Sequence, residues 1–298
     1  MNIKPWIQAA RLRTLPLSVS GIIVGSAYAN YQGFSDWRIV VLALLTTLGL
    51  QVLSNYANDY GDGVKGTDAN RIGEKRLVAA GIITAEQMKK AVIITAIFTF
   101  IIALLLIYVA FGKENFALSL IFILLGIGSI GAAIKYTVGK SAYGYSGFGD
   151  VFVFIFFGLV SVIGSNFLFT HFIDWKLFLP ASAIGLLSVA VLNLNNMRDI
   201  ENDTIAGKNT LVVKMGLEKA RIYQHLLIVI PFVLLFIFSI GISKQIFFSF
   251  FVFIFFLKHL EKVRKSKKYE DFDPELKKVA LGTFALSILF CIALIFLN

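Results

Sequence analysis

The sequence of 298 residues is 57% hydrophobic and only 15% charged, with a mean hydropathy of +0.79, which excludes an ordinary soluble domain. Its net charge of +10 does not indicate a nucleic-acid partner, because the basic residues lie in short segments between apolar runs. A single cysteine, Cys291, and three scattered histidines exclude a disulfide framework and a Cys/His metal motif, so any metal would have the oxygen ligands that Mg²⁺ prefers.

Nine uncharged or nearly uncharged runs, each near the roughly 20 residues that a helix needs to cross a bilayer, predict nine membrane-spanning helices. The first run superficially matches a secretory signal, but it is long enough to span, so we expect a retained first helix. The eighth run is short, so it must include Lys258, whose long side chain would extend its charge to the membrane interface. The runs cover about 14–35, 39–58, 91–111, 116–134, 151–170, 177–197, 222–243, 245–260 and 279–297.

The distribution of basic residues predicts the orientation of these helices. With the N-terminus in the cytoplasm, 24 of the 28 Lys and Arg residues fall in segments on the inner side of the membrane. The four in outer segments are Arg38, Lys113, Lys176 and Lys244. The positive-inside rule therefore predicts a cytoplasmic N-terminus and an outer C-terminus.

No linker divides the chain, so residues 1–298 are expected to form one membrane domain with two pseudo-repeated halves, about 1–140 and 141–298. Glycines in the first and fourth spans predict close contact between helix backbones. They are Gly21, Gly25, Gly126, Gly128 and Gly131.

The stretch from Asn55 to Arg76 closes the second apolar run and carries a cluster of polar residues. Four of its side chains, at i, i+3, i+4 and i+7, share one face of a continuing helix. They are Asn55, Asn58, Asp59 and Asp62. Ionisable groups at the end of a membrane helix are costly to desolvate, so the cluster indicates a functional site. The basic residues that follow it are Lys65, Arg71, Lys75 and Arg76.

A second stretch, from Asn193 to Lys208, also closes an apolar run and ends in acidic residues. Asn196, Asp199 and Asp203 stand at i, i+3 and i+7, again on one helical face. Both stretches fall on the predicted cytoplasmic side, so we expect each half of the chain to bring one helix end to a shared site.

The four aspartates of the two stretches would bring a formal charge of −4 into one pocket. Two Mg²⁺ ions would neutralise it, and Mg²⁺ usually binds through one or two carboxylates together with substrate phosphates. The neighbouring basic residues would then hold the rest of a diphosphate. This pattern indicates a phosphorylated lipid whose tail stays in the bilayer. The alternative is structural: acids at helix ends often pair with nearby Lys or Arg.

The motif N-D-Y-G-D at 58–62, together with D-I-E-N-D at 199–203, resembles the UbiA superfamily of intramembrane prenyltransferases. The longer spellings N-D-Y-G-D-G-V-K-G-T-D, R-I-G-E-K-R-L-V-A-A-G and R-D-I-E-N-D-T-I-A-G-K-N-T-L resemble the branch that prenylates 1,4-dihydroxy-2-naphthoate in menaquinone synthesis. The chain departs from the superfamily pattern at one position, where Gly66 replaces a third acid and Asp68 follows two residues later.

The resemblance implies that an allylic polyprenyl diphosphate ionises with the help of Mg²⁺, and that the aromatic ring attacks the allylic carbon. The implied metal ligands are Asn58, Asp59, Asp62, Asp68, Asn196, Asp199 and Asp203, and the four aspartates other than Asp68 are the implied catalytic acids. Tyr136 and Lys140 match a family loop that reaches the site. The implied diphosphate contacts are Lys65, Arg71, Lys75, Arg76, Arg198 and Lys208, and Asn55 and Asn193 are expected in the acceptor pocket. Arg11 and Arg13 could face the acceptor's carboxylate there, but the positive-inside rule explains them equally well.

The expected protein is therefore an all-α, multi-pass enzyme of the bacterial plasma (inner) membrane, with nine helices around a central cavity. Its expected product is demethylmenaquinol, and its chain-length preference and oligomeric state stay open. Two alternatives remain: a related enzyme with 4-hydroxybenzoate as acceptor, and a secondary transporter whose acids bind Na⁺ or H⁺. Transporter sites, however, lie near the bilayer midplane. A CDP-alcohol phosphotransferase is disfavoured because its D-G-x-x-A-R pattern is absent.

Overall fold

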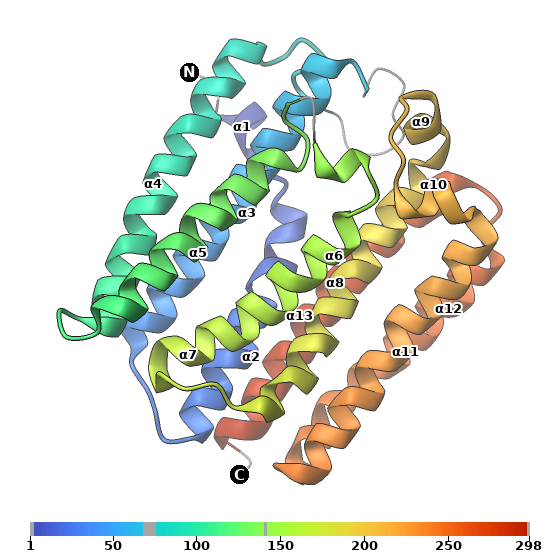
Figure 1. The fold of residues 1–298 in the computed structure, drawn as a ribbon. Coiled ribbons are helices and arrows are strands. Elements are labelled where there is room, and N and C mark those ends of the chain that lie inside the picture. The colour runs from blue at the N-terminus through green and yellow to red at the C-terminus, as the bar shows by residue number, and fades with distance from the viewer. Residues whose placement is uncertain (1–2, 68–75, 140–141, 297–298) are drawn as a thin grey trace.

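The computed structural model describes residues 3–67, 76–139 and 142–296, and within these ranges all regular structure is helical (Figure 1). The long helices are α2 (Leu15–Tyr31), α3 (Trp37–Lys65), α4 (Ala85–Phe111), α5 (Phe116–Lys135), α8 (Phe178–Arg198), α11 (Leu217–Gly241) and α13 (Phe272–Phe296). Another span is assembled from α6 (Gly149–Val153), the π-helix η3 (Phe154–Gly164) and α7 (Ser165–Thr170). The shorter segments are α1 (Lys4–Ala10), η1 (Leu12–Thr14), η2 (Tyr143–Tyr145), η4 (Trp175–Leu177), α9 (Ile200–Ile205), α10 (Leu211–Met215), η5 (Lys244–Val252), α12 (Phe253–Lys265) and η6 (Tyr269–Asp271).

Seven helical stretches of the described residues are long and apolar enough to cross a membrane, and the chain is a multi-pass membrane protein. The predicted count of nine spans is not confirmed. The run at 14–35 is shortened to the 17 residues of α2, and the chain turns at Gly33, whose φ is +91°. The run at 245–260 is divided between the 3₁₀-helix η5 and α12, whose last turn carries three basic residues.

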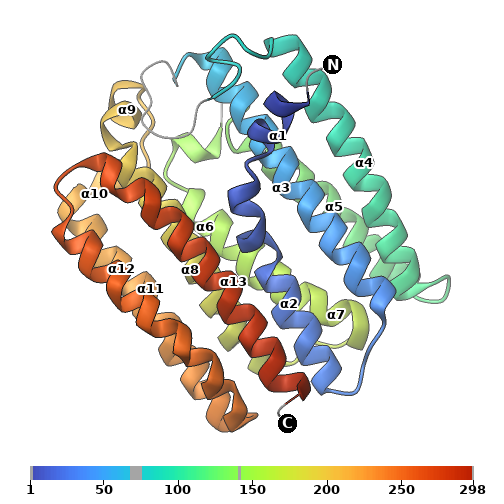
Figure 2. The ribbon, with the colours of Figure 1, turned by 180° about the vertical axis from the view of Figure 1, so that it is seen from behind.

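The helices form two groups with α2 between them (Figures 1 and 2). One group is α3, α4 and α5, and the other contains η3, α8, α11 and α13. α2 packs against α13 and η3 as well as α3. α1 lies at one end of the bundle and the end of α13 at the other, as expected for a chain with termini on opposite sides of a membrane.

Glycines let η3 approach its neighbours closely. A Cβ added to Gly21 of α2 would lie 2.3 Å from Oγ of Ser161, and one added to Gly158 would lie 2.7 Å from Cα of Gly185 in α8. The packing predicted for the glycines of α5 is wrong, because a Cβ on any of them would meet no atom within 4 Å. No residue of α5 is buried, so this helix presents its glycines to open space.

Candidate active site

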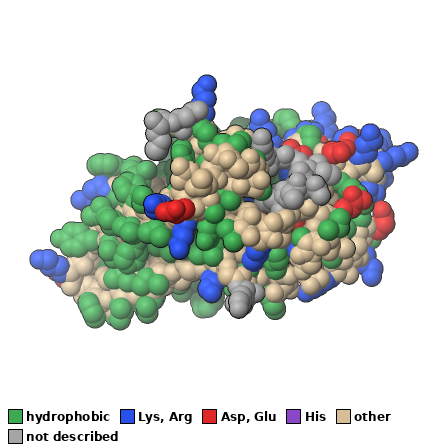
Figure 3. All heavy atoms as spheres, turned by 90° about the horizontal axis from the view of Figure 1, so that it is seen from above, with side chains coloured by type: hydrophobic (Ala, Val, Ile, Leu, Met, Phe, Trp, Pro, Cys, Tyr) green, Lys and Arg blue, Asp and Glu red, His purple; other side chains and the backbone are tan. Residues whose placement is uncertain are grey.

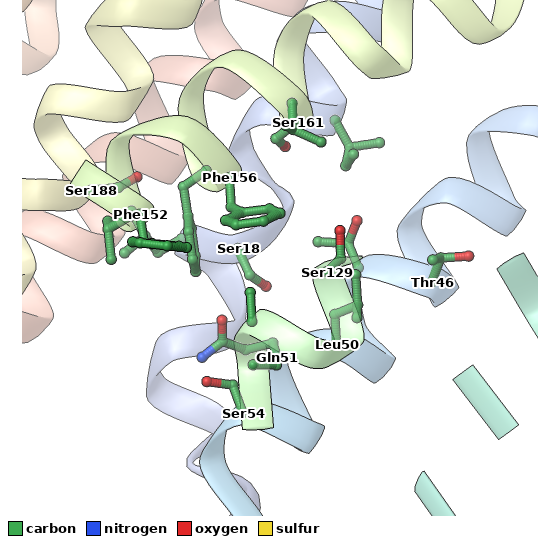
Figure 4. A pocket seen from close by; sticks show the side chains of 18 of the residues that line it. Ser18, Thr46, Leu50, Gln51, Ser54, Ser129, Phe152, Phe156, Ser161 and Ser188 are labelled. Atoms are coloured by element: carbon green, nitrogen blue, oxygen red, sulfur yellow. The ribbon is translucent and has the colours of Figure 1, made fainter. Parts of the chain in front are cut away.

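A cavity of about 840 Å³ lies between the two groups of helices. Its walls come from α2, α3, α4, α5, the α6–η3–α7 span, α8 and α13, whereas α11 and α12 supply none of the lining residues. Figure 4 shows side chains on these walls, among them Ser18, Gln51 and Phe156. The predicted central cavity is therefore present, but not every long helix surrounds it.

Charged side chains line one end of this cavity, and most of the remaining wall is apolar. The charged lining residues are Arg11, Arg13, Asp62, Arg76, Lys208 and Lys277. The apolar wall includes Leu50, Leu106, Phe122, Phe156 and Phe167. Figure 3 views the molecule from the end that carries α9 and shows Lys and Arg side chains around its margin with acidic ones between them. A molecule with an anionic head and a long apolar tail matches this division.

Asp62 is the acid of the first motif that faces the cavity. Its carboxylate accepts a 2.7 Å hydrogen bond from the Tyr145 hydroxyl at Oδ1 and pairs at 3.3 Å with Nη2 of Arg76 at Oδ2. The side chains of Asp62 and Arg76 are both buried. Asn58 lines the same wall, and its Oδ1 accepts a hydrogen bond from Thr137. These oxygens form the polar floor of the cavity.

Asp59 points elsewhere, although it is adjacent to Asn58. Its two carboxylate oxygens accept hydrogen bonds from the backbone N–H groups of Leu77 and Val78, at 3.1 and 3.0 Å. Asp59 does not line the cavity and instead fixes the segment that follows Arg76. Its predicted contact with a metal stays a prediction, and in this arrangement its visible role is to hold the chain that presents Arg76.

The second motif lies directly beside the first. Nδ2 of Asn202 donates a 2.8 Å hydrogen bond to the backbone oxygen of Thr67, just beyond the end of α3. Asp203, on the same short helix α9, pairs at 3.4 Å with Lys208, which lines the cavity. The expectation that two segments far apart in sequence meet at one end of the bundle therefore agrees with the geometry.

Arg198 does not reach the cavity, contrary to the prediction of a diphosphate contact. Its side chain is fully buried and forms hydrogen bonds with both carboxylate oxygens of Asp199, at 2.7 and 2.8 Å. It also pairs with Asp273 at the start of α13, and Asp273 in turn contacts Arg13. Because two carboxylates already engage the guanidinium, Arg198 ties α8 to α13.

The face of α8 that lines the cavity contains Asn195, one residue away from the predicted Asn196. Asn193, predicted for the acceptor pocket, does not line the cavity and instead donates to the backbone oxygen of Ala220 and to Gln224, both on α11. Asn196 is buried and does not line the cavity. Asn195 does line it, together with Ser188, Val191 and Leu192, at helical spacing.

The N-terminal segment supplies a second wall of polar groups. Arg11 and Arg13 line the cavity, and their contact with an acceptor stays a prediction. Arg11 has a left-handed backbone with φ of +51°. Asn55 also lines it, and its Nδ2 donates a 2.8 Å hydrogen bond to the backbone oxygen of Ala10. Asn55 thereby fastens this segment to α3.

Tyr136 also faces the cavity, and the neighbouring Tyr143 packs edge-to-face on it with ring centroids 5.3 Å apart. Burial, and to a lesser extent Tyr136, raises the pKa of Tyr143, so its hydroxyl stays protonated and donates to the backbone oxygen of Ala132. Four other predicted site residues lie outside the described part of the chain: Asp68, Arg71, Lys75 and Lys140.

Tyr145, like Asn195, is a site residue that the sequence analysis missed. It contacts Asp62 and also lies under Lys65, whose Nζ is 3.9 Å from the ring centroid. Lys65 does not line the cavity, and its Nζ donates to the backbone oxygen of Thr137. The only signal available in the sequence was the position of Tyr145 in the loop that carries Tyr136, nine residues later.

The donor chemistry of this end of the cavity fits Mg²⁺, since Asn58, Asp62 and Asp203 offer amide and carboxylate oxygens. Within the described residues, however, no three His, Cys, Asp or Glu side chains gather as a ready metal site. Asp62 and Asp203 are paired with Arg76 and Lys208. A metal ion would therefore have to replace these cations as partners of the carboxylates.

Comparison with known proteins agrees with this reading. The chain is 42% identical to a 1,4-dihydroxy-2-naphthoate octaprenyltransferase from Haemophilus influenzae, over 99% of this chain and 96% of that protein. It is 48% identical to the protein of the same name from Escherichia coli, over 79% and 76% of the two chains. In a further comparison, of structures, the fold resembles a UbiA homolog from Archaeoglobus fulgidus bound to GPP and Mg²⁺, with a TM-score of 0.66, 15% identity and coverage of 97% and 99%.

The resemblance first indicated by the two aspartate motifs extends over most of the chain. The sequence model of the UbiA prenyltransferase family matches residues 18–289. This range contains both motifs, the cavity-lining helices α3 to α8 and most of α13. The chain belongs to the UbiA prenyltransferase family.

Proposed function

We propose that this protein transfers a polyprenyl group from an allylic polyprenyl diphosphate to 1,4-dihydroxy-2-naphthoate, with release of diphosphate and CO₂, to give demethylmenaquinol. The observation that carries the proposal is the 42% identity, over nearly the whole of both chains, to a relative named for this acceptor. The cavity supports it independently, because a charged end and an apolar body suit a prenyl diphosphate.

The diphosphate would lie at the charged end, where Arg76 and Lys208 can bind its oxygens. Asn58, Asp62 and Asp203 would hold Mg²⁺ there, and we propose two ions because each of the two motifs brings one of these aspartates to the charged end. When bound, the ions stabilise the negative charge that develops on the leaving diphosphate. The apolar wall formed by residues such as Phe156 and Leu106 would hold the isoprenoid chain and keep water from the reacting carbon.

The acceptor would enter with its carboxylate toward Arg11 and Arg13, which lie on the wall formed by the N-terminal segment. The allylic C–O bond breaks, and a C–C bond forms at the ring carbon that bears the carboxylate. CO₂ then leaves, and the electron pair of its C–C bond restores the aromatic ring. This sequence needs no strong base from the protein. Tyr136, on the cavity wall, would orient the acceptor rather than remove a proton.

We further propose that the charged end faces the cytoplasm of a bacterium and that the protein resides in the plasma membrane. The support is the count of 24 among 28 Lys and Arg residues in segments on that side. A cation-coupled transporter is less well supported, because the acidic motifs lie at helix ends beside basic residues and not near the middle of the spans.

The proposal is tested by product analysis with purified protein, a polyprenyl diphosphate, Mg²⁺ and either of two acceptors. We expect a prenylated naphthoquinol that has lost the carboxyl group, identified by mass, together with CO₂ from carboxyl-labelled 1,4-dihydroxy-2-naphthoate. Preferential prenylation of 4-hydroxybenzoate without CO₂ release would contradict the acceptor assignment but not the family. Cation uptake by vesicles that contain the protein, without any transfer product, would contradict the enzyme assignment.

A further inference from the structure

Tyr145 lies in η2, the short turn between α5 and α6, and its hydroxyl connects to the first motif. The hydroxyl donates a 2.7 Å hydrogen bond to Oδ1 of Asp62 and lies 3.1 Å from Oγ1 of Thr67. The same carboxylate pairs with Arg76 through its other oxygen, Oδ2. The Tyr145 hydroxyl therefore fixes the rotation of the Asp62 carboxylate, so that Oδ2 faces the guanidinium of Arg76.

The ring of Tyr145 connects the two motifs. Nζ of Lys65, on the last turn of α3, is 3.9 Å from the ring centroid, and Nζ of Lys208, after α9, is 5.6 Å from it. An ammonium group within about 6 Å of an aromatic centroid is attracted by the ring. One tyrosine thus gathers two positive charges that come from segments more than 140 residues apart in sequence.

The loop around Tyr145 is itself fastened to the chain that directly follows the second motif. The backbone N–H of Asn209 donates to the backbone oxygen of Tyr145 at 3.0 Å. Nζ of Lys214 donates to the backbone oxygen of Ser146 at 2.8 Å. The chain then turns at Gly147, with φ of +86°. These contacts hold the ring between the two motifs independently of the side chain's own interactions.

We propose that Tyr145 is a positioning residue for the metal-bound diphosphate, with separate roles for its two parts. The hydroxyl orients Asp62 for Mg²⁺, as hydrogen-bond partners of metal-binding carboxylates commonly do. The ring holds Lys65 and Lys208 close together, so that Lys208 can leave Asp203 and bind the diphosphate when a metal ion takes over that carboxylate. This inference rests on the proposed function, because it assigns a role within the same site.

Two substitutions separate the roles. Tyr145→Phe removes the hydroxyl and keeps the ring, whereas Tyr145→Leu removes both. Tyr31→Phe is the matched control, since its hydroxyl contacts only a backbone oxygen, that of Ile242, among the described residues, and Tyr31 does not line the cavity. The measurement is calorimetric binding of geranyl S-thiolodiphosphate, a diphosphate analogue that is not turned over, at several Mg²⁺ concentrations and without acceptor.

For Tyr145→Phe, we expect the Mg²⁺ concentration at half-maximal binding to rise about tenfold, as for loss of a carboxylate's supporting hydrogen bond. At saturating Mg²⁺ its Kd for the analogue should stay near the wild-type value. Tyr145→Leu should show the same rise in Mg²⁺ requirement and a Kd at saturating Mg²⁺ that is also weaker by about tenfold, from the loss of two cation–π contacts. Tyr31→Phe should match the wild type.

Wild-type binding in both Tyr145 variants would overturn the role of Tyr145 and leave the proposed function intact. Equal weakening in Tyr31→Phe would also overturn it, because the effect would then be general. If Tyr145→Leu does not fold, Tyr145→Phe still decides the role of the hydroxyl. No Mg²⁺-dependent binding in the wild type would overturn the proposed function and this inference together.

Discussion

At the scale of single residues, two aspartates of the same motif have different partners. Asp59 and Asp62 share a helix face in the sequence pattern, yet one holds the backbone of Leu77 and Val78 and the other contacts Tyr145 and Arg76. Helical periodicity predicts which residues share a face only to within about one position. It cannot predict which loop contacts each side chain, because those contacts depend on the tertiary fold. The offset between Asn195 and Asn196 has the same cause.

Substitution of Asp62 by Ala should reduce turnover by at least about 10² to 10³, the range seen when a group that stabilises transition-state charge is removed. The reason is the loss of the carboxylate that faces the cavity. Turnover is measured with the substrates named above, and added EDTA should abolish wild-type activity. Activity of Asp62→Ala near the wild-type level would contradict a metal-binding role.

Arg198→Met should destabilise the protein by about 3–5 kcal/mol, because it takes the guanidinium from the buried carboxylate of Asp199 and leaves Asp273 with Arg13 alone. The measurement is the midpoint of unfolding by SDS in mixed micelles. Lys90→Ala is the control, since its exposed pair with Glu86 should be worth less than about 1 kcal/mol. Equal effects of the two substitutions would contradict the structural role of Arg198.

At the scale of helices, hydropathy predicted most of the membrane spans, and the structure revealed how they end. α3 continues beyond the apolar run to Lys65 and stops at Gly66, whose φ is +74°, so the motif residues remain helical. The π-helical backbone of η3 could not be predicted, because an apolar run has the same composition in α- and π-helices. π-helical segments are frequent at functional sites, and this one lines the cavity with Phe156 and Ser161.

Gly158→Ala should cost about 1–3 kcal/mol, because its Cβ would lie 2.7 Å from Cα of Gly185 and 2.6 Å from the backbone oxygen of Ala181. Gly128→Ala, on α5, should be neutral or stabilise slightly, since its Cβ meets nothing and alanine favours a helix. Unfolding midpoints of the two variants provide the test. A larger loss for Gly128→Ala would show that α5 packs differently from this structure.

At the scale of the whole molecule, the sequence predicted an all-helical membrane bundle with both motifs at one end. It did not reveal that α11 and α12 pack outside the cavity, because hydropathy does not distinguish a helix facing a cavity from one facing another helix. The buried polar groups of α11 gave a partial signal, since Gln224 contacts Asn193 and His259. The pairing of these groups, however, needed the fold.

The proposed orientation predicts opposite labelling of two exposed positions in a Cys291→Ser background. A cysteine in place of Glu201, on α9, should be shielded from impermeant thiol reagents in intact cells. A cysteine in place of Glu114, between α4 and α5, should react. Permeabilised cells are the control, in which both should label. The reverse pattern in intact cells would place the charged end of the cavity outside.

Competition between two acceptors in one reaction tests the proposed acceptor most directly. Purified protein receives equal concentrations of 1,4-dihydroxy-2-naphthoate and 4-hydroxybenzoate with a polyprenyl diphosphate and Mg²⁺. The products are then separated, identified and quantified by mass spectrometry. We predict that nearly all of the prenyl group appears on the naphthalene ring, with one CO₂ released for each transfer. Prenylated 4-hydroxybenzoate as the main product, with its carboxyl group retained, would contradict this prediction.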